Sequence, residues 1–323
     1  MTDSHHDLPG WRAGTAGGLT RANVLRGAGA ALAAAMIGDD TMAQGAGERM
    51  ETRPIPSSKE PLPVVGCGTW QTFDIGANPA ERAQRAGVLK ALFAAGGSVI
   101  DSSPMYGRSE GVVGDVLKEL GDRDKAFVAT KVWTRGHADG IAQMQRSMSL
   151  LRVETIDLMQ VHNLVDWKTH LATLRGWKQE GRVRYLGVTH YTSSSYRDLE
   201  AVMRAETLDF VQLNYSADDR TADQRLLPLA ADRGMAVLVN LPFGGSGGLM
   251  RALAGKPLPS FAAEIGCTGW AQLLLKFVLG HPAVTCVIPG TSKPEHMRDN
   301  VRAGMGPMPD QAMREKIAAT VRG

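Results

Sequence analysis

The sequence has little of what marks several classes of protein. Its 323 residues contain three cysteines, Cys67, Cys267 and Cys286, which show neither a CxxC pair nor metal-ligand spacing and are too scattered for a disulfide framework. Lys and Arg number 36 against 33 for Asp and Glu, so the chain lacks the basic excess of a nucleic-acid-binding protein. No apolar run reaches the length of about 18 residues that a membrane span requires. We therefore expect no nucleic-acid partner and no stable membrane insertion of the mature protein.

Residues 1–50 differ in character from the rest of the chain. Met1–Thr20 is polar and Gly-rich, and a basic patch then precedes a weakly apolar, Ala-rich run over Gly27–Ile37. Small residues in Thr41–Ala43 complete the anatomy of a signal peptide. The segment resembles a twin-arginine signal in which Ala22 replaces the second arginine, and the alternative is an Ala-rich amphipathic helix on a disordered leader. A working leader predicts a periplasmic location, and otherwise we expect a cytoplasmic one.

From residue 51 to residue 323, short apolar runs alternate with helical patterns. The helical stretches Ala80–Ala95 and Trp167–Glu180 carry apolar residues on one face and stop at Gly96 and Gly181. The apolar runs are typical of strands buried on both faces of a parallel sheet. Eight such strand–helix units predict an α/β fold of the (β/α)8 (TIM) barrel type. The predicted strands are Val64–Cys67, Ser98–Ser102, Ala126–Val132, Ile156–His162, Val183–Thr189, Asp209–Tyr215, Ala236–Asn240 and Thr285–Pro289.

The alternative fold class is a doubly wound parallel sheet. No predicted strand is followed by the glycine-rich turn and downstream acidic residue of a Rossmann unit, which favours the barrel. Arg53–Ile55 and Leu62–Val64 flank the polar residues Ser57–Glu60. We interpret these two runs as a hairpin that caps the bottom of the barrel.

Polar residues gather where three consecutive predicted strands end, and barrels of this type build active sites at that edge. Asp101 and Tyr106 follow one strand, Lys131 lies near the end of the next, and His162 ends the third. A lysine inside an apolar strand needs an anion, which Asp101 can supply. An ammonium beside Tyr106 favours the phenolate, so we expect the pKa of Tyr106 to fall from about 10 and the phenol to act as a general acid toward a carbonyl oxygen. His162 can orient the same oxygen or relay the proton.

Each of these residues taken alone has an ordinary structural interpretation. Asp101 can cap a helix, His162 can be a satisfied core residue, and an Asp–Lys pair is often only structural. Four such residues on consecutive strand ends favour a catalytic site. A buried lysine in a barrel can also attack a carbonyl as a Schiff-base lyase does, but Tyr106 and Asp101 beside Lys131 fit hydride chemistry better.

Residues 62–300 closely resemble the aldo-keto reductase superfamily. The motifs that carry the resemblance are Gly66-Cys67-Gly68-Thr69-Trp70, Asp101 to Gly107 with Ser109-Glu110, Ala129-Thr130-Lys131 and Gln160-Val161-His162. The resemblance implies a barrel that reduces an aldehyde or ketone with NADPH or NADH. It implies a tetrad in which Tyr106 donates the proton, Lys131 lowers its pKa, Asp101 holds Lys131 and His162 positions the carbonyl. The alternative is a non-catalytic nicotinamide-nucleotide-binding barrel, against which the intact tetrad argues.

The resemblance also implies cofactor contacts, and several depart from the family pattern. His190 replaces an Asn, and Asn240 replaces the Tyr that stacks on the nicotinamide, which leaves Phe243 as another ring for stacking. Gly290 and His296 stand where NADPH-preferring members carry Lys and Arg, so the choice between NADP and NAD stays open. Gly244–Leu249 is expected to fold over the pyrophosphate, with a flexible linker as the alternative. The implied cofactor-binding set is Gly68, Thr69, Trp70, Thr189, His190, Gln212, Asn240, Phe243, Gly244, Gly290, Thr291, Lys293, His296 and Asn300.

Large apolar side chains are expected to wall the substrate pocket. They are Trp70, Met105 and Trp133, with Trp167 as a further candidate, and they fit a small-molecule carbonyl compound with hydrophobic bulk. No metal site is expected. The oligomeric state stays open and is compatible with a monomer.

Overall fold

The computed structural model describes residues 49–322, so all but the last two residues of the predicted leader lie outside the described range. Eight strands form one sheet in the order β3 to β10, with every neighbouring pair parallel. Bridges between Val65 and Val287 and between Gly68 and Gly290 join the two edge strands and close the barrel. The predicted (β/α)8 barrel is confirmed, and the doubly wound alternative is wrong because an open sheet would leave these edges unpaired. The strands are β3 (Cys67–Gly68), β4 (Val99–Asp101), β5 (Phe127–Val132), β6 (Ile156–His162), β7 (Val183–His190), β8 (Phe210–Asn214), β9 (Ala236–Asn240) and β10 (Cys286–Val287).

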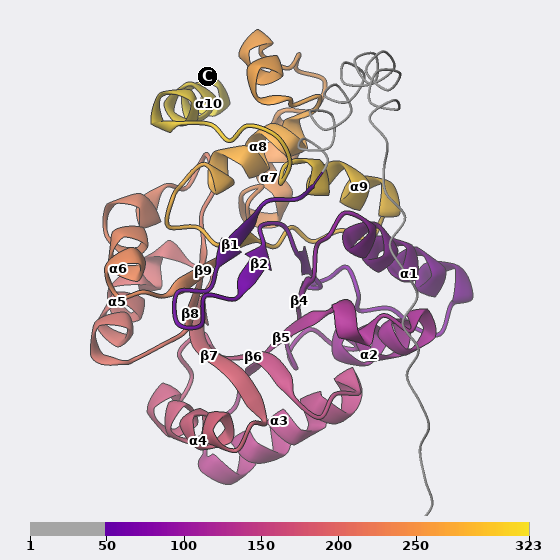
Figure 1. The fold of residues 1–323 in the computed structure, drawn as a ribbon, viewed down its shortest axis with the longest axis vertical. Coiled ribbons are helices and arrows are strands. Elements are labelled where there is room, and N and C mark those ends of the chain that lie inside the picture. Colours follow the sequence, from indigo (N-terminus) through magenta and orange to yellow (C-terminus); the bar gives the residue numbers. More distant parts are fainter. Residues whose placement is uncertain (1–48, 323) are drawn as a thin grey trace, which may run out of the picture. The chain divides into compact units, whose positions relative to one another are not determined.

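Helices surround the strands, as Figure 1 shows. Among the described residues, none of the helices is both long and apolar enough to cross a membrane. The helices are α1 (Pro79–Ala94), α2 (Ser109–Leu120), α3 (His137–Leu151), α4 (Trp167–Gln179), α5 (Tyr196–Ala205), α6 (Leu226–Asp232), α7 (Gly248–Ala252), α8 (Trp270–Leu279), α9 (Pro294–Arg302) and α10 (Gln311–Arg322).

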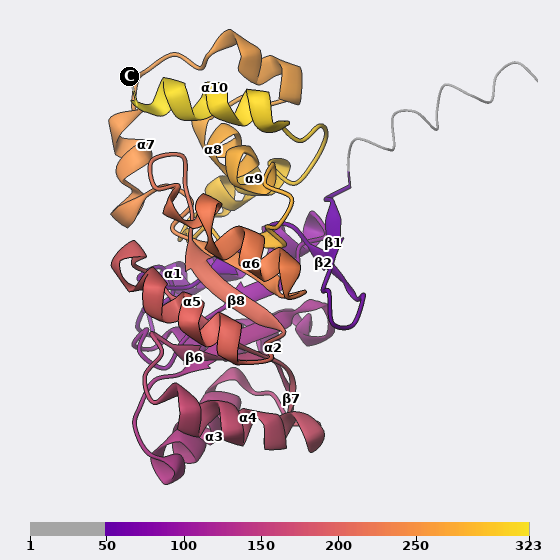
Figure 2. The same ribbon diagram turned by 90° about the vertical axis from the view of Figure 1, so that its left-hand side faces the viewer.

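The predicted hairpin is formed by β1 (Thr52–Pro54) and β2 (Pro61–Pro63), which pair antiparallel. Ile55 and Leu62 are fully buried and belong to the same apolar cluster as the side chains inside the barrel. The hydroxyl of Tyr185, on β7, also hydrogen-bonds to Ser58 and Glu60 in the hairpin loop. The hairpin therefore closes one end of the barrel, at the right-hand side of Figure 2.

The alternation of side chains along the strands positions the functional end. On β5 every second residue faces the interior, so Phe127 and Ala129 fill the lower layers and Lys131 follows on the same face. Leu158 on β6 is likewise followed by Gln160 and then His162. The interior is therefore apolar toward the hairpin and polar at the carboxyl ends of the strands.

Candidate active site

Asp101 and Lys131 form a buried ion pair between β4 and β5. The Lys131 ammonium lies 2.6 Å from Oδ2 of Asp101 and donates a second hydrogen bond to the backbone oxygen of Ser102 at 2.7 Å. The Lys131 side chain is 0% exposed. Burial alone lowers the pKa of Lys131, but Asp101 and Tyr106 outweigh it and the pKa lies above its ordinary value. The lysine is therefore a permanent cation.

The second oxygen of Asp101 holds two amides from across the barrel. Oδ1 accepts from Nε2 of Gln160 at 3.2 Å and from Nε2 of Gln212 at 2.9 Å. Gln160 comes from β6 and Gln212 from β8, so one carboxylate links four strands. Sequence reasoning quoted Gln160 as a motif residue but gave it no role, although it lies two residues before His162 on the same face of β6.

Tyr106 lies above this pair. The Lys131 ammonium is 5.1 Å from the centre of its ring, and the ring meets that of His162 edge-on at 5.9 Å. The predicted fall in the pKa of Tyr106 is wrong. Burial raises this pKa and has the largest effect, Asp101 also raises it, and the opposing pull of Lys131 does not overcome them. The phenol is therefore protonated at neutral pH, the form a proton donor requires.

His162 ends β6 and is buried beside Tyr106. Burial, then the charges of Lys131 and His190, lower its pKa to about 2. The imidazole is therefore neutral over the working pH range and carries one N–H. Its Nδ1 lies 3.0 Å from the hydroxyl oxygen of Ser103.

The loop that carries Tyr106 is held from both sides. The Tyr106 N–H donates to the Ser103 carbonyl at 3.0 Å, and the Ser109 hydroxyl donates to the Tyr106 carbonyl at 2.8 Å. Gly107 has a φ of +60°, and a Cβ there would clash with a carboxylate oxygen of Asp74. Asp74 in turn accepts from the Arg108 backbone at 3.1 Å. The loop is thus shaped for glycine at position 107.

A cavity of about 660 Å³ opens over the tetrad. Asp101, Tyr106 and His162 line it, whereas Lys131 lies behind them. The predicted residues that line it are Gly68, Thr69, Trp70, Met105, Trp133, Thr189, Gln212, Asn240, Phe243, Gly244 and Gly290. Ser246 and Gly247, in the segment Gly244–Leu249 that was expected to fold over the pyrophosphate, line it too. Sequence reasoning gave no role to further lining residues, namely Gln71, Thr72, Asn163, Tyr191, Leu241, Pro242 and Ile288.

Exposed apolar side chains form the mouth of the cavity. Trp70, Met105, Trp133 and Tyr191 are 44%, 38%, 41% and 52% exposed. Gln143 holds Trp133 in place, because its side chain bonds both the N–H and the carbonyl of that residue. No Lys, Arg or Glu is among the described residues that line the cavity, and Asp101 is the one carboxyl side chain among them.

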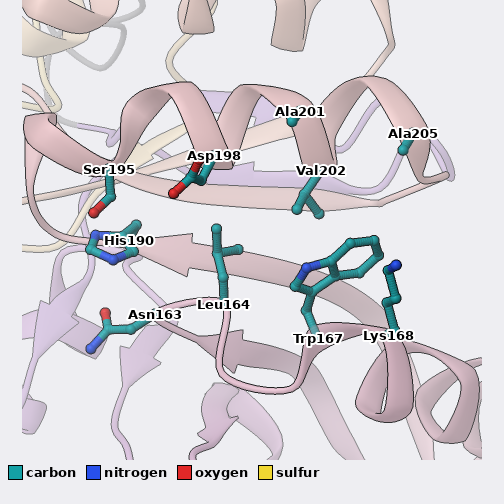
Figure 3. Close-up of a pocket in the computed structure, with 10 residues that line it drawn as sticks. All are labelled: Asn163, Leu164, Trp167, Lys168, His190, Ser195, Asp198, Ala201, Val202 and Ala205. Carbon is teal, nitrogen blue, oxygen red and sulfur yellow. The ribbon is translucent and has the colours of Figure 1, made fainter.

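His190 and Trp167 do not line this cavity. Both border a separate pocket of about 740 Å³ between α4 and α5, where Figure 3 shows His190 and Asn163 at one end and Trp167 at the other. Thr189 faces the barrel interior, so the next residue on the strand points away from it. Nδ1 of His190 is bonded by the N–H of Thr192 at 3.3 Å. Of these ten lining residues, Asn163 borders both pockets.

Four predicted cofactor residues lie beyond the cavity wall, on or just before α9. Thr291 and Asn300 are buried, whereas Lys293 and His296 are exposed. The Thr291 hydroxyl accepts the Lys293 N–H at 3.1 Å and so shapes the turn into the helix. Their assignment to the cofactor stays a prediction.

Donors and acceptors on β7, β8 and β9 match the needs of a nicotinamide carboxamide. Oε1 of Gln212 accepts from the Thr189 hydroxyl at 3.2 Å and from Nδ2 of Asn240 at 3.4 Å. Oδ1 of Asn240 is buried and has no partner among the described residues. A carboxamide N–H supplies what this acceptor lacks, so the residues present fit the cofactor, with Asn240 recognising an amide rather than stacking on a ring.

Comparison with known proteins places these features in a family. Residues 64–318 match the Aldo/keto reductase family. The methylglyoxal reductase YeaE of Escherichia coli is 27% identical, with 74% of this chain and 84% of that protein covered. The aldo-keto reductase str7 of Strobilurus tenacellus is 30% identical, with coverage of 68% and 76%. The NADH-specific methylglyoxal reductase of E. coli is 26% identical, with coverage of 79% and 93%.

Solved structures agree on the fold. An aldo-keto reductase from Klebsiella pneumoniae in complex with NADPH superposes with a TM-score of 0.68 at 24% identity, covering 84% of this chain and 95% of that one. The holo form of the aldo-keto reductase AKR11C1 from Bacillus halodurans gives 0.67 at 22% identity, covering 84% and 96%. The family match spans most of the chain, and the protein belongs to the aldo/keto reductase family.

Proposed function

We propose that this member of the family uses NADPH or NADH to reduce an uncharged aldehyde or ketone that carries an aromatic-sized apolar group. The observation that carries the proposal is the cavity mouth, where Trp70, Trp133 and Tyr191 offer ring faces and none of the described lining residues is a lysine or arginine. Apolar walls with few polar groups bind apolar ligands. A carboxylate on the substrate would find no partner there, so the site selects against anions.

The bound dinucleotide supplies the hydride for the carbonyl carbon. Tyr106 donates its phenolic proton to the carbonyl oxygen, and the two transfers together give the alcohol. The phenolate left on Tyr106 is stabilised by the Lys131 ammonium, 5.1 Å from the ring centre. Asp101 fixes Lys131, while Gln160 and Gln212 satisfy the other oxygen of Asp101 and so hold that carboxylate in place.

The geometry argues against a Schiff-base mechanism. The Lys131 nitrogen is fully buried, lies behind the cavity wall, and is bonded to Asp101 and Ser102. A permanently charged, enclosed ammonium has no free electron pair with which to attack a carbonyl.

A panel of matched carbonyl compounds tests the substrate class. We expect kcat/KM to be roughly ten- to a hundredfold higher for 4-methylbenzaldehyde than for acetaldehyde, as burial of a ring would give. We expect 4-carboxybenzaldehyde to be a poorer substrate than 4-methylbenzaldehyde. Methylglyoxal belongs in the panel because two relatives are named for it.

Trp133→Ala should reduce the preference for the bulky aldehyde. Trp270→Ala, on α8 and outside the cavity, is the matched control. A preference for small or anionic compounds that Trp133→Ala leaves unchanged would contradict the proposal.

We infer a weak preference between NADPH and NADH. Support comes from Gly290 and His296, which stand where the family's NADPH-preferring members carry cations, and Lys293 offers only a point charge. We therefore expect the ratio of kcat/KM for NADPH over NADH to stay small when it is measured at pH 6 and at pH 8. The two charged contacts that the loop lacks are worth roughly 1.5–3 kcal/mol each. A ratio above about a thousand at both pH values that Lys293→Ala leaves unchanged would therefore show that another cation binds the 2′-phosphate.

We further propose that the segment before about Gln44 is an export leader outside the barrel domain of residues 51–323, on the sequence anatomy alone. Cell fractionation and N-terminal sequencing of the full chain expressed in a Gram-negative host test export and cleavage. A chain beginning at Arg49 should melt at the temperature of the full chain, because a polar, Gly-rich segment buries little surface. An uncleaved cytoplasmic product would exclude export, and a large drop in melting temperature would show that the segment packs on the barrel.

A further inference from the structure

Ser103 lies between the strand end that carries Asp101 and the loop that carries Tyr106, and the proposed function gives it no role. Its side chain is fully buried. Its hydroxyl oxygen lies 3.0 Å from Nδ1 of His162 and accepts the N–H of Met105 at 3.4 Å. We propose that Ser103 donates its hydroxyl proton to Nδ1 of His162 and fixes the neutral tautomer that carries its proton on Nε2. Ser103 is then a positioning residue for the proposed carbonyl reduction, on which this role rests.

The direction of the hydrogen bond follows from counting protons. A neutral imidazole has one N–H and one bare nitrogen, and a serine hydroxyl has one hydrogen to donate. The Ser103 oxygen already accepts from Met105, and no other acceptor for its hydrogen is found among the described residues. If Nδ1 carried the proton, the buried hydroxyl hydrogen would have no acceptor, which is costly. With Nδ1 as the acceptor, the buried hydroxyl hydrogen of Ser103 is satisfied.

The opposite side of the ring is free for the substrate. None of the described residues hydrogen-bonds to Nε2 of His162. The buried side-chain atoms without a partner do not include this nitrogen, so it is not enclosed. Because His162 lines the cavity, Nε2 is reached from the cavity. An Nε2–H there donates to the carbonyl oxygen that Tyr106 protonates. His162 therefore orients the carbonyl as a neutral donor, which decides against the proton relay that the sequence left open.

Nitrogen NMR of the full chain labelled with [¹⁵N]histidine tests the tautomer directly, with His162→Gln assigning the signals. At pH 7 we expect the pyridine-type signal of His162 on Nδ1 and the pyrrole-type signal on Nε2. Ser103→Ala should mix the two tautomers and lower kcat roughly three- to tenfold, as loss of one neutral hydrogen bond would, with a smaller change in KM. Ser103→Thr keeps a hydroxyl and should restore the tautomer and most of kcat.

Ser102→Ala is the matched control for the NMR signals. The Ser102 hydroxyl accepts from Thr69 and does not touch His162, so its removal should leave the His162 tautomer unchanged. A proton on Nδ1 in the unmodified protein overturns the proposal, and so does an unchanged His162 spectrum in Ser103→Ala. Because the spectra need neither substrate nor cofactor, this outcome is separate from failure of the proposed reaction.

Discussion

Tyr106 is the proposed proton donor, and a substitution can take away its hydroxyl and leave its ring. Tyr106→Phe should lower carbonyl reduction by roughly 10²–10⁴-fold, the usual worth of a placed general acid, while cofactor binding followed by fluorescence stays unchanged. The matched control is Tyr185→Phe, which removes a phenol at the hairpin end of the barrel, bonded to Ser58 and Glu60. That variant should lose stability but keep its rate constants. Retained turnover in Tyr106→Phe would contradict the assignment.

Lys131 acts on Tyr106 through charge, so its removal should appear in the pH profile. Reduction needs the protonated phenol, so the rate falls as pH rises through the pKa of Tyr106. Burial raises this pKa and Lys131 lowers it, so Lys131→Met should move the alkaline limb to still higher pH as well as lower the rate. The comparison variant combines Asp101→Asn with Lys131→Met in one protein, so that no unpaired carboxylate is left buried. An unchanged alkaline limb in both variants would mean that the pair is only structural.

The same residue shows where sequence reasoning stops. The sequence predicts which groups meet, because the strand ends converge whatever the details of packing. It does not predict whether burial or the neighbouring cation dominates the pKa of Tyr106, since desolvation depends on how completely the loop after β4 covers the ring. Ser103 and Tyr191 were missed for a related reason, because both lie on loops whose path no periodic pattern predicts.

At the scale of elements, alternation along the strands accounts for much of the site. It explains why Gln160 shares a face with His162 and why His190 turns away from Thr189 toward the pocket between α4 and α5. The motif comparison assigned His190 to the cofactor, whereas strand geometry alone places it on the other face. The β3 strand was predicted to begin at Val64 but begins at Cys67, because only from Cys67 is it paired with β4. Before that, Val64 and Gly66 exchange backbone hydrogen bonds with Val287, and the Val64 N–H donates to Glu51.

Arg85 on α1 links two segments at the edge of the cavity over the tetrad. Its Nε donates to the carbonyl of Thr72 at 2.6 Å, and its Nη1 to that of Ser292 at 3.4 Å. Thr72 lines the cavity, and Ser292 follows the lining residue Gly290. Arg85→Met should therefore weaken binding of NADPH and NADH about tenfold, within the roughly 1.5–3 kcal/mol of a charged hydrogen bond, with little change in kcat.

Fluorescence titration with each cofactor measures this effect. Arg82→Met is the matched control, because Arg82 lies on the same helix and pairs with Asp115 rather than with a cavity segment. Equal losses of affinity in the two variants would show that α1 stability, and not the link between the segments, controls binding.

At the scale of the whole molecule, two histidines with lowered pKa values connect the site and the outer helices to stability against acid. His162 has a pKa of about 2 and His281, which follows α8, has one of about 4. Burial lowers the pKa of His281 first, and Arg314, Arg53 and Arg220 lower it further against the opposing effect of Asp223. The folded protein thus keeps both rings neutral at pH values where the unfolded chain, with a histidine pKa of about 6.5, takes up protons.

The sign of the pH dependence follows from this difference. Between pH 6.5 and 4 the unfolded state binds more protons than the native state. The contribution of these histidines to the free energy of unfolding is therefore greatest above about pH 6.5 and decreases as the pH is lowered. The decrease is about 1.4 kcal/mol per pH unit for each such histidine. Buried Glu110, whose pKa is raised by burial, opposes this trend.

We expect His281→Asn to flatten the slope of the free energy of unfolding against pH between pH 6.5 and 4.5 by about one proton. Asparagine can still accept the Ala283 N–H but does not titrate. Urea unfolding at a series of pH values measures the slope. The difference in the free energy of unfolding between the unmodified protein and His281→Asn at pH 8 measures any loss of packing. Parallel stability curves for the two proteins from pH 8 to pH 4.5 would show that His281 takes up its proton in the folded state as readily as in the unfolded chain.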